Sequence, residues 1–393
     1  MVMRRHCAGL ALALALVPGP ARPAFAQHAH ETTTPADGRW QVSVEGQAFL
    51  TANLQERRFR DFHQVESQNW LMGTAGRRLG RGTLRLHGMV SLEPFTLRDL
   101  GSAQVFQTGE TFEDAPLIDY QHPHDLVMGL AARLEQPMGP RARLVLAGGL
   151  VGDPALGPTA FMHRASARVQ PTAPLGHHQL DSTHVTPGVV TVGVGAGAWL
   201  VETSAFRGRE PDENRLDIDL GTLDSWSARA SWQGRGLLAQ VSGARLADPD
   251  AIEPGDVTRL TASIEYSSTR PGRPVAATVA WGRNDGRFAP EAAWLAELTL
   301  GLGPRGTAYG RGELVDKHIL EAGGRHPPGF EHPHVLSRVG ALTAGYAVEV
   351  ARRARAALSV GADLTAYRVP ANLSEPYGRP WSIHVYGRLA LEH

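Results

Sequence analysis

The sequence predicts an all-β protein, a single transmembrane barrel of about sixteen antiparallel strands. Apolar and polar residues alternate with a period of two along many segments, which is typical of strands with one apolar and one polar face. Several segments reach the roughly nine to eleven residues that a strand needs to cross a bilayer obliquely. The connections between them are alternately short and long, as in membrane barrels.

The N-terminal 26 residues have the pattern of a secretory signal peptide. Two arginines precede an apolar run, Ala8 to Val17, and an A-x-A cleavage site ends at Ala26. We therefore expect cleavage after Ala26, a periplasmic lead over residues 27–38, and a barrel over residues 39–393.

The composition narrows the function classes. The 393 residues carry 39 basic and 39 acidic side chains, and this balance argues against a nucleic-acid partner. The one cysteine, Cys7, lies in the signal segment, which argues against a small disulfide-stapled domain. No stretch after the signal has 18 consecutive apolar residues, so no transmembrane helix is expected.

The strands follow from the alternation in chain order. The first begins with Trp40, Val42 and Val44 on one face and polar residues between them. The sixteen expected strands cover residues 39–51, 66–76, 82–92, 124–136, 141–151, 183–194, 197–208, 223–233, 236–247, 256–268, 275–285, 291–302, 306–317, 336–351, 354–368 and 379–391.

The connections give the orientation. Short ones are expected at 77–81, 137–140, 195–196, 234–235, 269–274, 303–305 and 352–353, and long ones at 52–65, 93–123, 152–182, 209–222, 318–335 and 369–378. Short periplasmic turns and long extracellular loops are the asymmetry of outer-membrane barrels. A soluble sandwich or propeller is the alternative, but propeller strands are short and follow a repeat, and the chain shows no repeat of fixed period.

Charged residues on the polar strand faces predict a water-filled, mixed-charge lumen. All eight tryptophans lie in or at the ends of expected strands, as in interfacial girdles. The expected lumen-lining residues are Glu45, Arg85, Arg229, Arg259, Glu265, Glu297 and Arg388.

Histidines gather in the long loops or at their edges and predict a copper or zinc site, because neutral imidazole suits these ions. Two segments echo each other, Gln121 to Asp125 and Glu331 to His334. We expect the loops 93–123 and 152–182 to bring one cluster together on the extracellular side. Its expected members are His122, His124, Asp125, His163, His177, His178, Asp181 and His184.

Several alternatives stay open at this point. His124 continues the even-numbered, lipid-facing row of the strand that follows it, so Asp125 is the more natural interior ligand. Loop histidines are often simply solvated. Asp181, Ser182 and His184 hold the side chains of a hydrolase, although a triad depends on three-dimensional geometry. The loop from Arg209 to Asp219 offers oxygen ligands for calcium, or is a solvated loop.

The terminal strand, Trp381 to His393, resembles the C-terminal strand by which outer-membrane barrels are recognised for assembly, although it ends in histidine. Together with the blocks Gln107–Glu110, Gln121–Asp125, Gly157–Arg164, Leu175–His184 and Gly208–Arg215, the chain resembles a group of porin-like proteobacterial outer-membrane β-barrels. The resemblance implies an outer-membrane location and a barrel fold, and implies no substrate.

The favoured function is a porin-like channel for small polar solutes, linked to copper or zinc through the histidine-rich loops. No other cofactor and no enzymatic activity are expected. The alternatives are a hydrolase at the barrel rim and a structural or adhesive barrel with a plugged lumen. Expected partners are outer-membrane lipid, lipopolysaccharide and the barrel-assembly machinery, and an oligomer is compatible with the sequence.

Overall fold

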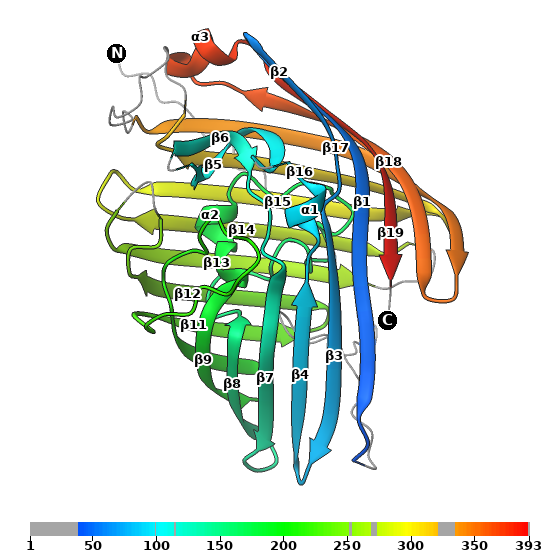
Figure 1. Ribbon diagram of the computed structural model, residues 1–393. Coiled ribbons are helices and arrows are strands. Elements are labelled where there is room, and N and C mark those ends of the chain that lie inside the picture. Colours follow the sequence, from blue (N-terminus) through cyan, green and yellow to red (C-terminus); the bar gives the residue numbers. More distant parts are fainter. Residues whose placement is uncertain are drawn as a thin grey trace, which may run out of the picture.

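The protein is a closed antiparallel barrel of sixteen strand positions (Figure 1). A computed structural model describes residues 38–98, 100–113, 115–250, 254–268, 273–320 and 335–391. The expected signal peptide, most of the N-terminal lead and the segment Glu331 to His334 lie outside the described residues.

The barrel strands pair with their neighbours in chain order, and β1 closes the ring by pairing with β19. They are β1 (Gln41–Arg57), β2 (Arg60–Glu66), β3 (Asn69–Leu79), β4 (Gly82–Val90), β7 (Val127–Pro137), β8 (Ala142–Gly152), β9 (Thr186–Ala196), β10 (Trp199–Phe206), β11 (Ser225–Gly234), β12 (Leu237–Leu246), β13 (Val257–Ser268), β14 (Val275–Asp285), β15 (Glu291–Leu302), β16 (Gly306–Lys317), β17 (Ser337–Arg353), β18 (Ala356–Arg368) and β19 (Trp381–Leu391).

The strand count of the sequence prediction is confirmed, because β2 and β3 occupy one barrel position. Both pair with β1, β2 opposite residues 51–57 and β3 opposite residues 41–48. One expected loop is wrong. Residues 52–65 form no long loop, because β1 continues to Arg57 and the chain turns back at Arg58 and Phe59. The inward side chains here, such as Asn53 and Gln55, are polar but buried by loop residues, which a purely local pattern does not reveal.

One end of the barrel has mostly short turns, and we call it the short-turn end; the other is the long-loop end. Leu79 pairs with Gly82 across one short turn, and two residues join β17 to β18. The long-loop end carries α1 (Glu93–Thr96), α2 (His177–Leu180), the 3-10 helices η1 (Ser182–His184) and η2 (Ala371–Leu373), and α3 (Ser374–Tyr377). Among the described residues, no helix is both long and apolar enough to span a membrane.

The outer wall of the barrel is apolar. Alternation places one row of each strand on the outside, where exposed side chains include Leu50, Leu86, Leu146, Val192, Val241, Ile264, Val279, Leu298, Leu342 and Val385. Trp226 and Trp294 are exposed near the long-loop end, and Trp199 near the short-turn end. In water this surface would be unfavourable, whereas lipid tails match it.

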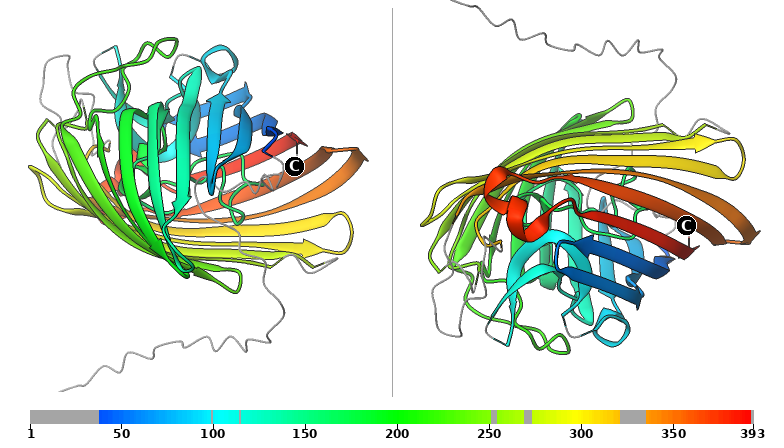
Figure 2. Two further views of the ribbon diagram at one scale, coloured as in Figure 1. Left: turned by 90° about the horizontal axis from the view of Figure 1, so that it is seen from below. Right: turned by 90° about the horizontal axis from the view of Figure 1, so that it is seen from above.

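Two long connections fold into the barrel instead of extending from it. The hairpin loop, residues 91–126, contains the pair β5 (Ser102–Phe112) and β6 (Ala115–Gln121). The helical loop, residues 153–185, contains α2, which contacts β13, β14 and β15. Figure 2 shows the sheet curving around these segments from two opposite sides.

The loops fill the long-loop half of the interior with an apolar core. Phe106 and Val105 of the hairpin loop are fully buried, as are Leu175 and Leu180 of the helical loop. They pack into one cluster with Leu373 of η2, Tyr377 of α3 and the wall residues Phe62, Ala280, Ala293, Leu295, Val315 and Val339. The barrel half that carries the long loops is therefore closed by packed side chains.

Candidate functional site

Five histidines from the two inward loops meet where the loops touch. The ring centroids of His124 and His184 lie 5.3 Å apart, and those of His184 and His177 lie 5.2 Å apart. His122 lies 6.3 Å from His124, and His178 lies 5.5 Å from His177. The expected meeting of the two loops in one histidine cluster is thus present in the fold, inside the barrel and not on its rim.

His124 and His184 turn one nitrogen toward each other, with their Nε2 atoms 3.2 Å apart. The Nδ1 of His124 lies 2.8 Å from a Glu93 carboxylate oxygen, and the Nδ1 of His184 lies 2.7 Å from the Asp181 carbonyl oxygen. Both acceptors require a hydrogen on Nδ1, so in the neutral rings both Nε2 lone pairs point into the same gap.

That gap suits either a shared proton or a metal ion. Two nitrogens bound to one tetrahedral zinc lie about 3.3 Å apart, because each Zn–N bond is about 2.0–2.1 Å. Burial lowers the pKa of His124, but the Glu93 carboxylate outweighs it and raises that pKa above its ordinary value. Burial, with the nearby His177 and His124, holds the pKa of His184 far below its ordinary value. Without metal, His124 is therefore the first of the two rings to take a proton, which its Nε2 donates to the Nε2 of His184.

His177 is oriented by a buried carboxylate. Its Nδ1 lies 2.7 Å from Asp181, and Asp181 also accepts a hydrogen bond from Arg164 at 2.9 Å. Burial raises the pKa of Asp181, but the hydrogen bond from His177 and the charge of Arg164 lower it well below its ordinary value. Asp181 therefore stays anionic and orients the His177 ring.

Asp125 is held by Arg215 from another loop, and His122 by Glu110 of the same hairpin loop. Arg215 donates to Asp125 at 3.3 Å and to Glu110 at 3.0 Å, and the Nε2 of His122 contacts Glu110. Burial raises the pKa of Asp125 to about 6. It lowers the pKa of His122 far below its ordinary value. Asp125 thus pairs with an arginine, and His122 stays neutral.

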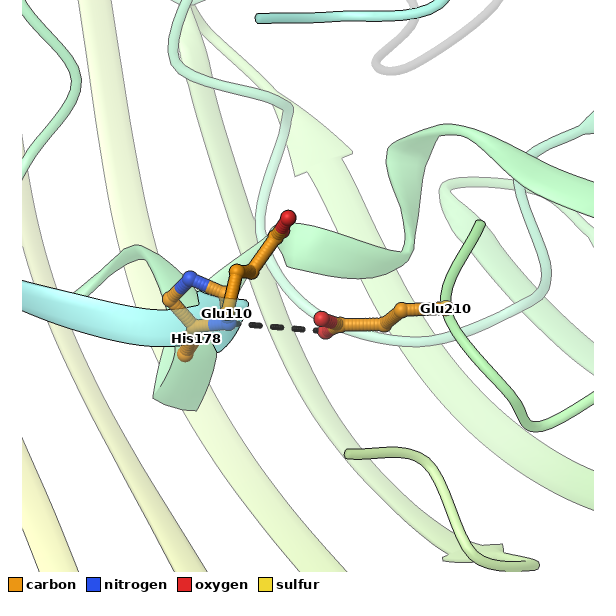
Figure 3. A group of neighbouring side chains, drawn as sticks. All are labelled: Glu110, His178 and Glu210. Atoms are coloured by element: carbon orange, nitrogen blue, oxygen red, sulfur yellow. Dashed lines mark ion pairs between the residues drawn. The ribbon is translucent and has the colours of Figure 1, made fainter. Parts of the chain in front are cut away.

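A second potential ligand group joins three loops (Figure 3). Ligand atoms of Glu110, His178 and Glu210 all lie within 4.8 Å of one another. The Nδ1 of His178 lies 3.4 Å from Glu210. Burial raises the pKa of Glu110 to about 7, whereas His178 lowers that of Glu210, against burial, to about 2.

Sequence reasoning missed Glu93, Glu110 and Glu210 as partners of the histidines. Glu110 and Glu210 lie in the sequence blocks Gln107–Glu110 and Gly208–Arg215, which offered a signal. Glu93 offered none. The exposed acidic residues Asp212 and Asp217, with the half-buried Asp219, form a separate group of oxygen ligands.

Two predicted positions need correction. The structure places His124 inside the barrel, 8% exposed, and not in the lipid-facing row, because β7 begins only at Val127. His163 lies at the edge of the cluster, where its ring packs edge-on against Trp70 at 4.8 Å.

The charges expected on the lumen face point inward, and most hold the helical loop. Arg259 donates to Ser182 at 3.0 Å, Glu265 accepts from the Thr159 amide at 3.0 Å, and Arg229 lies 3.4 Å from the Gly157 carbonyl oxygen. Glu297 binds Arg164 at 2.8 Å. The remaining three, Glu45, Arg85 and Arg388, lie on the interior face of β1, β4 and β19; Arg85 reaches Glu135 at 3.4 Å and Arg388 reaches Gln47 at 3.1 Å.

The hydrolase arrangement is not assembled in this geometry. The Ser182 hydroxyl faces Arg259, while the two ring nitrogens of His184 face the Asp181 carbonyl oxygen and His124. A serine nucleophile needs its base within hydrogen-bond reach.

Below the histidine cluster lies a cavity of about 200 Å³. It is lined near the loops by Asp153, His163 and His184, and near the short turns by Leu237 and Tyr266. Burial raises the pKa of Asp153 to about 8. The cavity therefore extends from the cluster toward the short-turn end.

The fold is that of porin barrels. A solved structure of Salmonella typhi OmpF in complex with daunomycin matches with a TM-score of 0.53 and 9% identity, over 89% of this chain and 97% of that one. The anion-selective porin from Comamonas acidovorans matches with a TM-score of 0.49 and 10% identity, over 90% and 100%. No protein-family model and no curated protein matches the sequence. The similarity defines the barrel class and nothing finer.

Proposed function

We propose that the protein is a bacterial outer-membrane barrel that forms a porin-like passage for small polar solutes and binds copper or zinc at the loops closing its outer end. The apolar outer wall and the girdling tryptophans support the membrane location. The long-loop end then faces outward, so the histidine cluster lies between the outside and the cavity.

The observation that carries the metal proposal is the His124–His184 pair. Its Nε2 atoms lie 3.2 Å apart, and each ring is oriented by an acceptor at Nδ1. Oriented imidazoles are characteristic of built metal sites. The sequence after the signal segment has no cysteine, so no thiolate competes with these imidazoles for the ion.

The passage proposal is supported by the cavity and by the polar anchors of the helical loop. Wall groups such as Glu297, which binds Arg164, direct charge into the interior, as the lining of a water-filled passage does. The apolar cluster at the long-loop end favours a second candidate, a structural barrel with a plugged lumen.

Calorimetry with Zn²⁺ and Cu²⁺ on detergent-folded protein tests the metal site. We expect His124→Gln to weaken binding at least about tenfold, whereas the matched control His63→Gln, an exposed histidine on β2, leaves it unchanged. Equal binding by wild type and His124→Gln, or no binding tighter than about 100 μM (roughly −5.5 kcal/mol), overturns the proposal.

Single-channel recording in planar bilayers tests the passage. We expect discrete conductance steps that chelator and added Zn²⁺ shift in opposite directions. Silence under both conditions supports the plugged barrel, and ester or peptide hydrolysis lost in Ser182→Ala supports the hydrolase. Recovery without detergent as a monodisperse soluble protein contradicts the membrane location.

A further inference from the structure

Four of the five methionines that follow the signal segment gather in one place. Met72, Met89, Met128 and Met162 form a buried cluster together with Ala160, and their exposures are 5%, 4%, 2% and 5%. The fifth, Met138, is 65% exposed at a short turn. The chain offers no other sulfur after Cys7, so nearly all of its thioethers meet at one point.

Three of these methionines, Met72, Met89 and Met128, lie in a row on the adjacent strands β3, β4 and β7. Met72 of β3 and Met89 of β4 are direct cross-strand partners, and side chains so placed have Cβ atoms about 4.5–5.5 Å apart. The β4–β7 pairing slips by one residue between Met89 and Val90, opposite Met128. Such a slip re-aims side chains, and it turns Met128 from the lipid-facing row of its strand to the interior.

The row lines the cavity under the histidine cluster. Met72, Met89 and Met128 belong to its wall, together with His87 and His163. Met162 of the helical loop packs on the row from above. The cavity extends to Leu237 and Tyr266 beside the short turns.

Both arginines that face the cavity, Arg85 and Arg133, are paired with carboxylates. Arg133 binds Glu202 and Glu135, each at 3.0 Å, and Arg85 lies 3.4 Å from Glu135. Asp153 and Glu265 also face the cavity. Desolvating a monovalent ion costs less than desolvating a divalent one, and thioether ligands select soft ions over hard ones.

We propose that the Met72, Met89 and Met128 thioethers form a binding site for a soft monovalent cation, Cu(I) or its analogue Ag(I), in the cavity below the histidine cluster. The site is independent of the proposed copper or zinc site, because its donors lie on barrel strands and the histidines on the two inward loops. It also uses different donor atoms and a different class of ion. Methionine side chains are flexible, so their sulfurs converge on an ion without movement of the strands.

The test is calorimetric titration of detergent-folded protein with Ag(I) in chloride-free buffer. We expect wild type to bind one equivalent and the Met72→Leu/Met89→Leu/Met128→Leu variant to bind at least about a hundredfold more weakly. Leucine keeps the volume and apolar character of methionine, so the variant tests the sulfur and not core packing. Met138→Leu is the matched control and should bind as wild type does.

The NMR signals of the methionine methyl groups give a second measurement. Ag(I) would not shift these signals if the methionines had a purely structural role. Ag(I) should shift the signals of Met72, Met89 and Met128 and leave that of Met138 in place. Heat-modifiable gel migration shows whether the triple leucine variant folds. If the variant does not fold, the methyl signals of the wild-type protein still show whether Ag(I) binds at the methionines. Unshifted signals, or equal Ag(I) affinity in the folded triple variant, show that the methionines are core residues only.

The two metal proposals can be refuted independently of each other. His124 does not line the cavity, so His124→Gln should lose Zn²⁺ affinity and keep Ag(I) affinity. The triple leucine variant should show the reverse. Loss of both ions in both variants would mean that a single site exists, and would overturn the assignment to the methionines.

Discussion

Replacing Arg164 by methionine should release the helical loop from the barrel wall while the barrel stays folded. The Arg164 side chain is fully buried and binds Glu297 at 2.8 Å and Asp181 at 2.9 Å. It also donates to the Thr159 carbonyl oxygen at 2.8 Å. Methionine retains much of the volume but leaves two buried carboxylates without their cation.

The magnitude follows from the burial of the pair. Removing one partner of a buried ion pair costs about 3–5 kcal/mol, which corresponds to roughly a hundred- to several-thousandfold increase in local opening. The barrel ladder contributes none of this energy, so the loss stays within residues 153–185. Amide hydrogen exchange of the detergent-folded protein, read segment by segment, measures it directly.

A matched control lies four residues further along the same loop. Arg168 is exposed. Arg168→Met should change the free energy of local opening, as measured by hydrogen exchange, by no more than about 0.5 kcal/mol, as surface substitutions do. If Arg164→Met leaves the exchange of residues 153–185 unchanged, or if both variants act equally, the ion-pair anchor is not what holds the loop. Adding Glu297→Gln to Arg164→Met should recover part of the protection.

Three further predictions concern the membrane face, the histidines and the loop anchor. Val241 of β12 is 59% exposed among apolar neighbours. In lipid vesicles, Val241→Arg should lower the free energy of unfolding by about 2–4 kcal/mol relative to Val241→Leu, as measured by denaturant unfolding. Equal stability of the two variants would place this face in water. Zn²⁺ affinity should fall as the pH drops, starting above pH 6.5, because Glu93 raises the pKa of His124 and a metal-binding imidazole must be neutral. Glu93→Gln should move this loss of affinity to lower pH. A calorimetric pH profile that Glu93→Gln leaves unchanged contradicts the assignment of His124 as a ligand. Tyr386→Phe removes the hydrogen bond to the Val169 carbonyl oxygen at 3.0 Å. It should lower the free energy of local opening near Val169, measured by hydrogen exchange, by about 0.5–1.5 kcal/mol. Tyr346→Phe on the outer face should not have this effect.

The sequence by itself determined the barrel wall. Alternation is a local property, since each strand residue faces the side opposite to its neighbour whatever lies across the barrel. The runs at 275–285, 291–302 and 306–317 therefore match β14, β15 and β16 without change. The sequence also placed the histidines on two loops flanking β7 and β8 or at the edges of those loops, which is why their meeting was predictable.

Only the tertiary structure decided where the loops go and what the histidines touch. Inward folding of the hairpin loop depends on contacts such as Asn53 with Ala103 and Arg57 with Asp119, each between residues about 50 or more positions apart. Glu93 reaches His124 across 31 positions. The one-residue slip beside Met89, which turns Met128 inward, leaves no trace in the local alternation. A period-two pattern fixes the face of a side chain only while the register holds. The wall and the meeting of the two loops could therefore be read from the sequence, whereas the contacts within the site could not.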